Sequence, residues 1–315
     1  MIQRLVPFFI FFSGLMYAAD QPTVIVLTGA PGSEEYGRLF SKWTEQWKEA
    51  AAKGGADFHH IDKPAKGTTK KAAQKLIAAQ AGEAKSPLWI VLIGHGTFDG
   101  KKAKFNLQGP DLDAGEMADW LKDSQRPMAI INCTSSSAPF LPALSRKSRV
   151  VITATRSGFE QNFSHLGGYL AAAIGNLEAD FDKDGQTSLL EAWLAAARHT
   201  ADFYKNESRL ATEHTILDDN GDSKGTPADW YRGLRIAKKS NDAALLPDGL
   251  RAHQFHLIPS KEERALTSAQ RTERDRLEIE CAQLRALKDD LEGEKYYQRL
   301  EQILTKLGQI YFPKK

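Results

Sequence analysis

The sequence has few cysteines, no excess of charge of either sign and, after its first nineteen residues, no long apolar run. Its two cysteines, Cys133 and Cys281, exclude a disulfide framework of the kind that stabilises small secreted domains. Forty-two basic residues stand against 40 acidic ones, so no strong field attracts nucleic acid. We therefore expect a protein or peptide partner, no nucleic acid, and no membrane span after removal of the first nineteen residues.

The first nineteen residues have the pattern of an export signal. Arg4 supplies the positive charge, residues 5–15 are apolar, and Ala18 and Ala19 place small side chains at the cleavage point. The sequence therefore predicts an exported protein, periplasmic or extracellular, with a signal peptide at 1–19.

Apolar runs alternate with helical patterns through residues 20–246, which predicts an α/β domain with a doubly wound, mainly parallel sheet flanked by helices. Asp113 and Glu116 form a capping-box pattern at one helix start. Expected strands cover 24–28, 58–61, 87–93, 128–131 and 149–155. Expected helices include one carrying Leu39, Phe40, Trp43 and Trp47, and others at 69–79, 113–121, 163–174 and 189–204.

The C-terminal part has a different composition. Residues 247–259 show little periodicity and are expected to be a linker. Residues 260–315 are rich in charge, with leucines and isoleucines at helical spacing, which predicts a helical extension folded as a hairpin near Gly293. Such helices pack or self-associate, as in a coiled coil, without chemistry of their own.

Two short motifs follow apolar strands and carry the candidate chemistry. Gly94-His95-Gly96 ends one expected strand, and Cys133 ends another. Because the carboxyl ends of parallel strands share one edge of the sheet, His95 is a candidate general base and Cys133 a candidate nucleophile. The amides of Gly96 and Cys133 are candidate donors to an oxyanion. The serines at 135–137 are a weaker alternative nucleophile.

These motifs resemble the caspase-like cysteine peptidases of clan CD, most closely the legumain family in its bacterial type. The likeness lies in the strand closing on His95-Gly96, the run Cys133-Thr134-Ser135-Ser136-Ser137, and the segments 211–214 and 217–222. The resemblance spans about residues 22–230. It implies a caspase-like fold, a His95/Cys133 dyad that needs no third member, and Gly96 as an oxyanion donor.

The same resemblance places a first-subsite pocket between residues 30–38 and 155–160. Its charged candidates for substrate binding are Glu35, Arg38, Arg156 and Glu160. A carboxylate in the pocket favours a basic residue of the substrate, whereas Arg156 favours an acidic residue or asparagine. The sequence leaves this choice open.

A calcium-loop pattern starts at Asp180. Asp180, Asp182 and Asp184 occupy positions one, three and five, followed by Gly185, the carbonyl donor Gln186 and Glu191 at position twelve. The pattern predicts a structural calcium ion. A second, weaker match covers 218–222, where Ser223 replaces the glycine and Asp229 is the acid at position twelve; a polar turn is the alternative there.

Together these features predict an exported, calcium-stabilised cysteine endopeptidase that acts through His95 and Cys133. The main alternative is a catalytically inactive caspase-like domain that binds calcium and interacts with proteins. A third class, an acyl transferase or peptide ligase, would use the same dyad.

Overall fold

The computed structural model describes residues 21–63, 66–82, 84, 86–237 and 246–312. The predicted signal peptide at 1–19 lies outside the described residues. No helix in the described part of the chain has the length and apolar character needed to cross a membrane.

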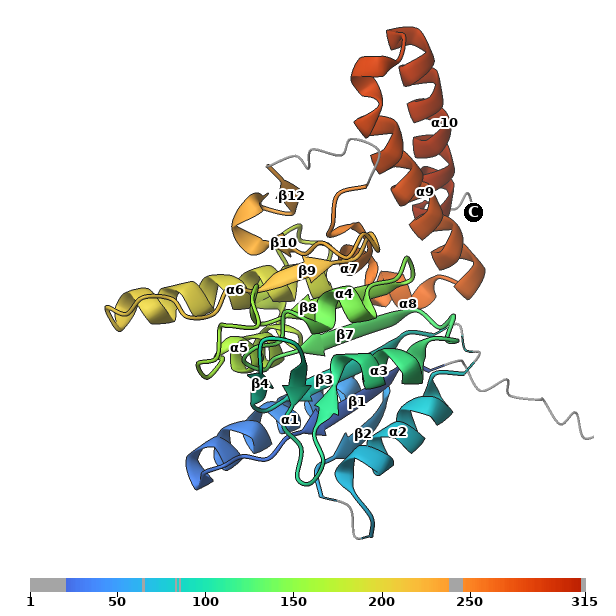
Figure 1. Cartoon of the computed structure of the whole chain (residues 1–315). Helices are drawn as coiled ribbons and strands as arrows, with labels where there is room; N and C mark the ends of the chain where they lie inside the picture. The colour runs from blue at the N-terminus through green and yellow to red at the C-terminus, as the bar shows by residue number, and fades with distance from the viewer. Residues whose placement is uncertain (1–20, 64–65, 83, 85, 238–245, 313–315) are drawn as a thin grey trace, which may run out of the picture.

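Seven strands form the central sheet (Figure 1). They are β1 (Thr23–Thr28), β2 (Asp57–Ile61), β3 (Leu88–Ile93), β7 (Met128–Asn132), β8 (Arg149–Thr153), β9 (Ile216–Asp218) and β10 (Thr226–Pro227). Their spatial order is β10-β9-β8-β7-β3-β1-β2, with β9 and β10 antiparallel to their neighbours and the other five parallel. β1, β3, β7 and β8 are buried along their whole length, as expected for inner strands covered on both faces.

Helices cover both faces of this sheet, because successive strand residues point to opposite sides (Figure 1). On one face Ala129 and Ile131 pack against α1 (Glu34–Gly54), α5 (Leu166–Ala173) and α6 (Leu189–Asn206). On the other, Met128 and Ile130 pack with α2 (Thr69–Gln80), α3 (Ala114–Leu121) and α4 (Phe140–Leu144). The predicted doubly wound, mainly parallel α/β sheet flanked by helices is confirmed.

Helix starts follow the predicted capping chemistry. Asp113 accepts from the Glu116 amide at 2.9 Å, and Glu116 accepts from the Asp113 amide at 3.1 Å, so the expected capping box is present. The very short elements were not expected, because two or three residues carry too little periodicity to be recognised. They are β4 (Gly96–Phe98), β5 (Ala103–Phe105), β6 (Leu112–Asp113), β11 (Tyr231–Arg232), β12 (Arg235–Ile236), and the 3-10 helices η1 (Leu177–Ala179), η2 (Ala228–Trp230) and η3 (Lys288–Asp290).

The segment 247–259, predicted to be a linker, packs into the domain instead. It contains α7 (Leu250–Gln254), and Leu257 is fully buried in the core beside α1. The Phe255 carbonyl accepts from the Leu189 amide at 2.8 Å, which joins the segment to the start of α6. The domain therefore extends to about residue 259, because these long-range contacts leave no signature in the local sequence.

The C-terminal extension consists of α8 (Lys261–Ala265), α9 (Ser268–Ala286) and α10 (Gly293–Tyr311). α9 and α10 form the expected hairpin, which projects from the sheet domain (Figure 1). Its small core consists of Leu277, Cys281, Leu284, Tyr296 and Ile303.

Candidate functional site

The candidate site lies at the carboxyl ends of β3 and β7. These strands are parallel neighbours, with Leu92 paired to Asn132. The chain therefore brings the turn that carries His95 and the turn that starts at Cys133 to the same edge of the sheet. This is the juxtaposition expected from the sequence.

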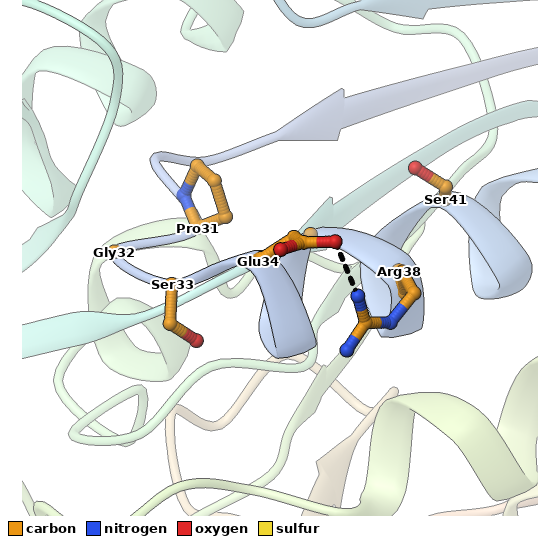
Figure 2. Close-up of a pocket in the computed structure, with 7 residues that line it drawn as sticks. Pro31, Gly32, Ser33, Glu34, Arg38 and Ser41 are labelled. Atoms are coloured by element: carbon orange, nitrogen blue, oxygen red, sulfur yellow. Dashed lines mark hydrogen bonds and ion pairs between the residues drawn. The ribbon is translucent and has the colours of Figure 1, made fainter.

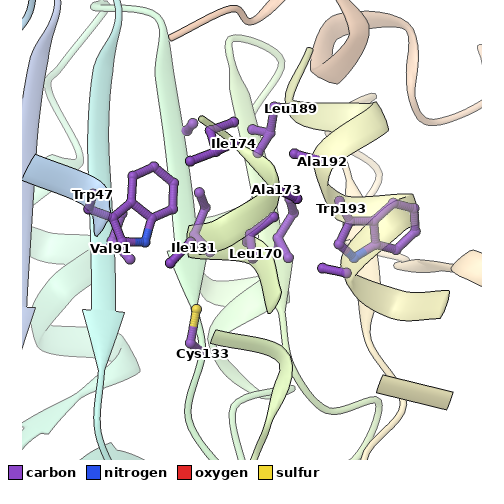
Figure 3. Packing of buried hydrophobic residues seen from close by; sticks show 14 of the residues in the cluster. Trp47, Val91, Ile131, Cys133, Leu170, Ala173, Ile174, Leu189, Ala192 and Trp193 are labelled. Atoms are coloured by element: carbon purple, nitrogen blue, oxygen red, sulfur yellow. The ribbon is translucent and has the colours of Figure 1, made fainter. Parts of the chain in front are cut away.

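The Cys133 side chain, however, belongs to the hydrophobic core and not to the edge. It is 1% exposed and packs with Ile131 and Leu170, with its sulfur directed into the cluster (Figure 3). α5 covers it closely, since a Cβ added at Gly167 would lie 2.9 Å from the Cys133 Cβ. The cause is strand alternation: residues 129, 131 and 133 all face α1 and α5.

The surroundings of the thiol disfavour its ionised form. Burial and, to a smaller extent, the negative charge of Glu213 raise the pKa of Cys133 to about 12. A catalytic thiolate needs positive neighbours or a hydrogen-bonded base. Among the described residues, no hydrogen bond joins His95 to Cys133: His95 Nε2 lies 3.1 Å from the Pro31 carbonyl oxygen. The imidazole packs edge-on against Tyr36, with ring centroids 4.7 Å apart.

Both amides predicted to form an oxyanion hole already have acceptors. The Cys133 amide donates to the Leu92 carbonyl at 3.0 Å. The Gly96 amide donates to Ser135 Oγ at 3.2 Å, and the Ser135 hydroxyl donates back to the Gly96 carbonyl at 3.0 Å. A Cβ at Gly96 would lie 2.7 Å from Thr134 Oγ1, so hydroxyls and not the thiol face this glycine. The turn at 133–136 therefore closes over Gly96.

This turn also holds unusual backbone and unpaired polar atoms. Ser136 has φ of 54°, a left-handed conformation that costs free energy for a residue other than glycine. Its amide donates to the Glu160 carbonyl at 2.8 Å. Ser136 Oγ and Asn132 Nδ2 are buried and have no hydrogen-bond partner in the described part of the chain. Strain and unsatisfied groups of this kind mark the turn as a candidate functional element.

The predicted substrate-binding residues lie in different environments. An open hollow of about 750 Å³ at the start of α1 is lined by Pro31, Gly32, Ser33, Glu34, Gly37, Arg38 and Ser41 (Figure 2). Arg38 pairs there with Glu34 at 2.6 Å. Glu35 is exposed and does not line the hollow.

Arg156 and Glu160 are also absent from that hollow. Glu160 Oε1 lies 2.5 Å from His214 Nδ1, and Glu160 Oε2 accepts from the Arg156 amide at 2.9 Å. The Glu160 carboxylate thus joins two segments of the fold and is not a free pocket acid. Sequence reasoning grouped the four residues in one pocket because it had no information on these local contacts.

Glu213 is a buried residue whose part in the site was not predicted. Its carboxylate accepts from Ser164 Oγ at 2.6 Å and from the amides of His165 and Leu166 at 2.8 and 3.2 Å. It therefore caps the start of α5, the helix that covers Cys133. Burial raises the pKa of Glu213 even though these hydrogen bonds act in the opposite direction. The only sequence signal was its place in the segment 211–214.

The loop from Asp180 to Glu191 brings together three acids of the calcium pattern. Asp180, Asp182 and Asp184 each bring one carboxylate oxygen within 4.8 Å of the others. Gly185 has φ of 87° and donates to Asp180 Oδ2 at 3.1 Å, while Asp180 Oδ1 is buried with no partner among the described residues. Glu191, at the start of α6, is 1% exposed, and its two oxygens accept from the amides of Phe181 and Ser188, each at 2.8 Å. The unpaired Asp180 oxygen among further acids would fit a divalent cation such as calcium.

The side chain of Gln186, unlike those of the loop acids, is hydrogen-bonded on both its oxygen and its nitrogen. Its side-chain amide donates to Asp184 Oδ2 at 3.0 Å, and its side-chain oxygen accepts from the Ser260 amide at 3.0 Å. The side chain is therefore used within the fold, and the backbone carbonyl is the group Gln186 can offer to an ion. Burial raises the pKa of Asp184, and the charges of Asp182 and Glu191 add to this effect.

The loop beginning at Asp218 repeats this backbone conformation. Gly221 and Ser223 have φ of 81° and 65°, matching Lys183 and Gly185 in the first loop. The Ser223 amide donates to Asp218 Oδ2 at 3.0 Å, as Gly185 does to Asp180. Ser223 thus adopts the glycine conformation despite its side chain. Both Asp218 oxygens have protein partners, whereas Asp180 Oδ1 has none among the described residues, so the loop at Asp218 agrees with a polar turn.

Replacing Cys133 with alanine provides a pH-dependent test of its burial. The pKa of Cys133 is about 12 in the folded chain, above the ordinary value near 9 of the unfolded chain. The neutral thiol therefore makes its full contribution to stability below pH 9, and this contribution decreases as the pH rises toward 12. We expect the wild-type advantage over Cys133→Ala to decrease by about 1 kcal/mol per pH unit above pH 9. Urea unfolding of both proteins between pH 8 and 10.5 measures this difference in the free energy of unfolding. A difference that does not change with pH would contradict the burial of the thiol.

Comparison with known proteins gives only distant similarities. No protein family model matches the chain, and no curated protein matches it. The Drosophila initiator caspase Dronc is 14% identical with a TM-score of 0.42, over 65% of this chain and 81% of that one. Raptor from Chaetomium thermophilum is 8% identical with a TM-score of 0.39, over 92% of this chain and 35% of that one. Membership of the legumain family stays a prediction, and function is inferred from the site's own residues.

Proposed function

We propose that this chain is a non-catalytic, caspase-like protein-interaction domain braced by a divalent cation in the loop 180–191. The observation that carries this proposal is the placement of the Cys133 thiol in the core, 1% exposed. A pKa of about 12 leaves about one molecule in 10⁵ as thiolate at pH 7. The Gly96 and Cys133 amides are also bonded internally, so neither the thiolate of Cys133 nor these two amides are free for catalysis in this state.

Binding is supported by the surface around the strand ends. The open hollow beside Pro31 offers both charges of the Glu34–Arg38 pair (Figure 2). The Pro31 carbonyl oxygen lies 3.1 Å from His95 Nε2. Phe159 is 73% exposed and packs edge-on against Phe98, the last residue of β4. Polar groups beside exposed aromatic surface suit an extended peptide or a protein loop as the partner.

The first experiment measures thiol access and hydrolysis together. Folded protein, with and without calcium, is treated with iodoacetamide, and the peptide containing Cys133 is quantified by mass spectrometry against protein in urea. We expect labelling of the folded chain to be at least a hundredfold slower, and a fluorogenic peptide library to remain uncleaved. Rapid labelling, with cleavage that disappears in Cys133→Ala, would overturn the proposal.

A cysteine endopeptidase is the second candidate, and one observation favours it. The paired ends of β3 and β7 bring His95 and Cys133 to one edge of the sheet. Activity would require the turn at 133–136 to open and expose the thiol to the imidazole. The strained Ser136 and the unpaired Ser136 Oγ lie in this turn. Alkylation that becomes fast only with a peptide ligand would favour this function.

Binding itself needs a positive test. Peptides selected from a displayed library on the folded chain should lose affinity at least tenfold in Arg38→Ala and retain it in Cys133→Ala. The control is Arg198→Ala, since Arg198 is 82% exposed on α6 and lies outside the hollow. Equal binding by Arg38→Ala would place the interaction elsewhere.

The proposal includes export and self-association. Export through residues 1–19 predicts a mature chain that starts near residue 20, which mass spectrometry of protein from its native host checks. Self-association through α9 and α10 is supported by exposed apolar side chains, among them Leu304 at 49%. Sedimentation of the chain with and without residues 260–315 measures it.

A further inference from the structure

His253 reaches the cation loop from a different part of the chain. It lies on α7, and its Nε2 atom is 3.0 Å from Asp182 Oδ2. Asp182, Glu191 and His253 each bring one possible ligand atom within 4.8 Å of the others. The calcium-loop pattern contains oxygen donors alone, so this imidazole is an additional donor from outside the motif.

The chain holds His253 in this place without help from an ion. Two Asp219 oxygens accept from the amides of Gly249 and Ala252, at 2.9 and 2.8 Å, which anchors the start of α7. Beyond α7, the Phe255 carbonyl accepts from Leu189. The helix carrying the imidazole is therefore fixed to the body on both sides of His253, as a preorganised ligand should be.

The loop beside His253 also has unsatisfied negative charge. Asp180 is 5% exposed and its Oδ1 atom has no hydrogen-bond partner. The nearby cation Lys183 donates to the Asp180 backbone carbonyl at 2.6 Å and not to that oxygen. Asp180 is grouped with Asp182 and Asp184, and Asp182 also belongs to the group that contains His253. A buried carboxylate oxygen without a partner among the described residues indicates a missing positive group in this loop.

The chemistry of the two donors favours a transition ion. His253 Nε2 and Asp182 Oδ2 lie 3.0 Å apart, at hydrogen-bond distance, so an ion that binds both would replace this hydrogen bond. Imidazole is a good ligand for zinc, carboxylates suit manganese, and calcium takes oxygen ligands.

We propose that His253 is a nitrogen ligand of the loop ion, and that the site prefers a first-row transition ion such as Zn²⁺ or Mn²⁺ over Ca²⁺. This inference rests on the cation loop of the proposed function. The ion then joins the loop, α6 through Glu191 and α7 through His253. It thereby fastens the segment 247–259, which leads to the C-terminal hairpin, to the sheet domain.

The test uses the full chain, stripped with a chelator and titrated calorimetrically with Zn²⁺, Mn²⁺ and Ca²⁺. We expect wild type to bind Zn²⁺ or Mn²⁺ at least tenfold more tightly than Ca²⁺. His253→Gln should lose at least tenfold in Zn²⁺ affinity and less than threefold in Ca²⁺ affinity. His199→Gln is the matched control, because His199 is exposed on α6 and stacks on Tyr169. Circular dichroism of the metal-free proteins verifies that they fold.

Co²⁺ reports on the ligand itself. Its visible absorption should change in position and intensity in His253→Gln, because the spectrum depends on the number of nitrogen ligands. An unchanged spectrum, or an equal loss of affinity for Zn²⁺ and Ca²⁺, would overturn the nitrogen ligand while leaving the cation loop in place. Failure of wild type to bind any of the three ions would instead refute the cation loop of the proposed function.

Discussion

Asp180→Asn is expected to lower divalent-cation affinity at least a hundredfold and to remove most of the cation-dependent stability of the protein. Asp180 Oδ1 is the buried oxygen without a partner, and asparagine replaces one charged oxygen with a hydrogen-bond donor or a neutral oxygen. An ion at a thousand times its dissociation constant stabilises the folded state by about 4 kcal/mol. For a chain of this size that corresponds to a rise in Tm of about 10 °C.

Thermal unfolding with excess cation and with chelator measures this effect. Wild type should show the full rise, and Asp180→Asn at most about a third of it. Asp202→Asn is the control, because Asp202 is exposed on α6 and its ion pair with Arg198 is 4.0 Å long. A full cation-dependent rise in Asp180→Asn would mean that the ion binds elsewhere.

Gly96→Ala is expected to destabilise the protein by about 3 kcal/mol or more. A Cβ at this position would lie 2.1 Å from the Ser135 carbonyl oxygen and 2.7 Å from Thr134 Oγ1. The carbonyl is backbone and the turn is buried, so the clash requires movement of the whole segment 133–136. Urea unfolding monitored by circular dichroism gives the free energy of unfolding.

Gly308→Ala is the matched control for this substitution. Gly308 lies on α10 with open space around its Cα, and alanine there should raise stability by up to about 1 kcal/mol through helix propensity. If Gly96→Ala were as stable as wild type, the turn at 133–136 would have room to move. That result would favour the peptidase candidate, which needs such an opening.

The candidate site was predicted in its location but not in its chemistry. The apolar runs before His95 and Cys133 were sufficient to predict two parallel strands ending at one edge, because buried strands are recognisable from composition. The Cys133 side chain points to the same face of the sheet as Ile131, because side chains alternate between the two faces. This alternation continues one residue beyond the end of β7. The bonds from Gly96 to Ser135 and from Glu160 to His214 join segments 39 and 54 residues apart, and no local pattern encodes them.

The sequence by itself determined the alternation of strands and helices, the capping box at Asp113 and the acidic loop at Asp180, because each depends on residues within a few positions of one another. Only the tertiary structure decided that Cys133 is buried under Gly167, that the Gly96 amide has an acceptor, and that His253 lies beside Asp182 of the acidic loop. These features depend on packing between distant segments. A side chain acquires its solvent access, pKa and partners only when that packing is complete.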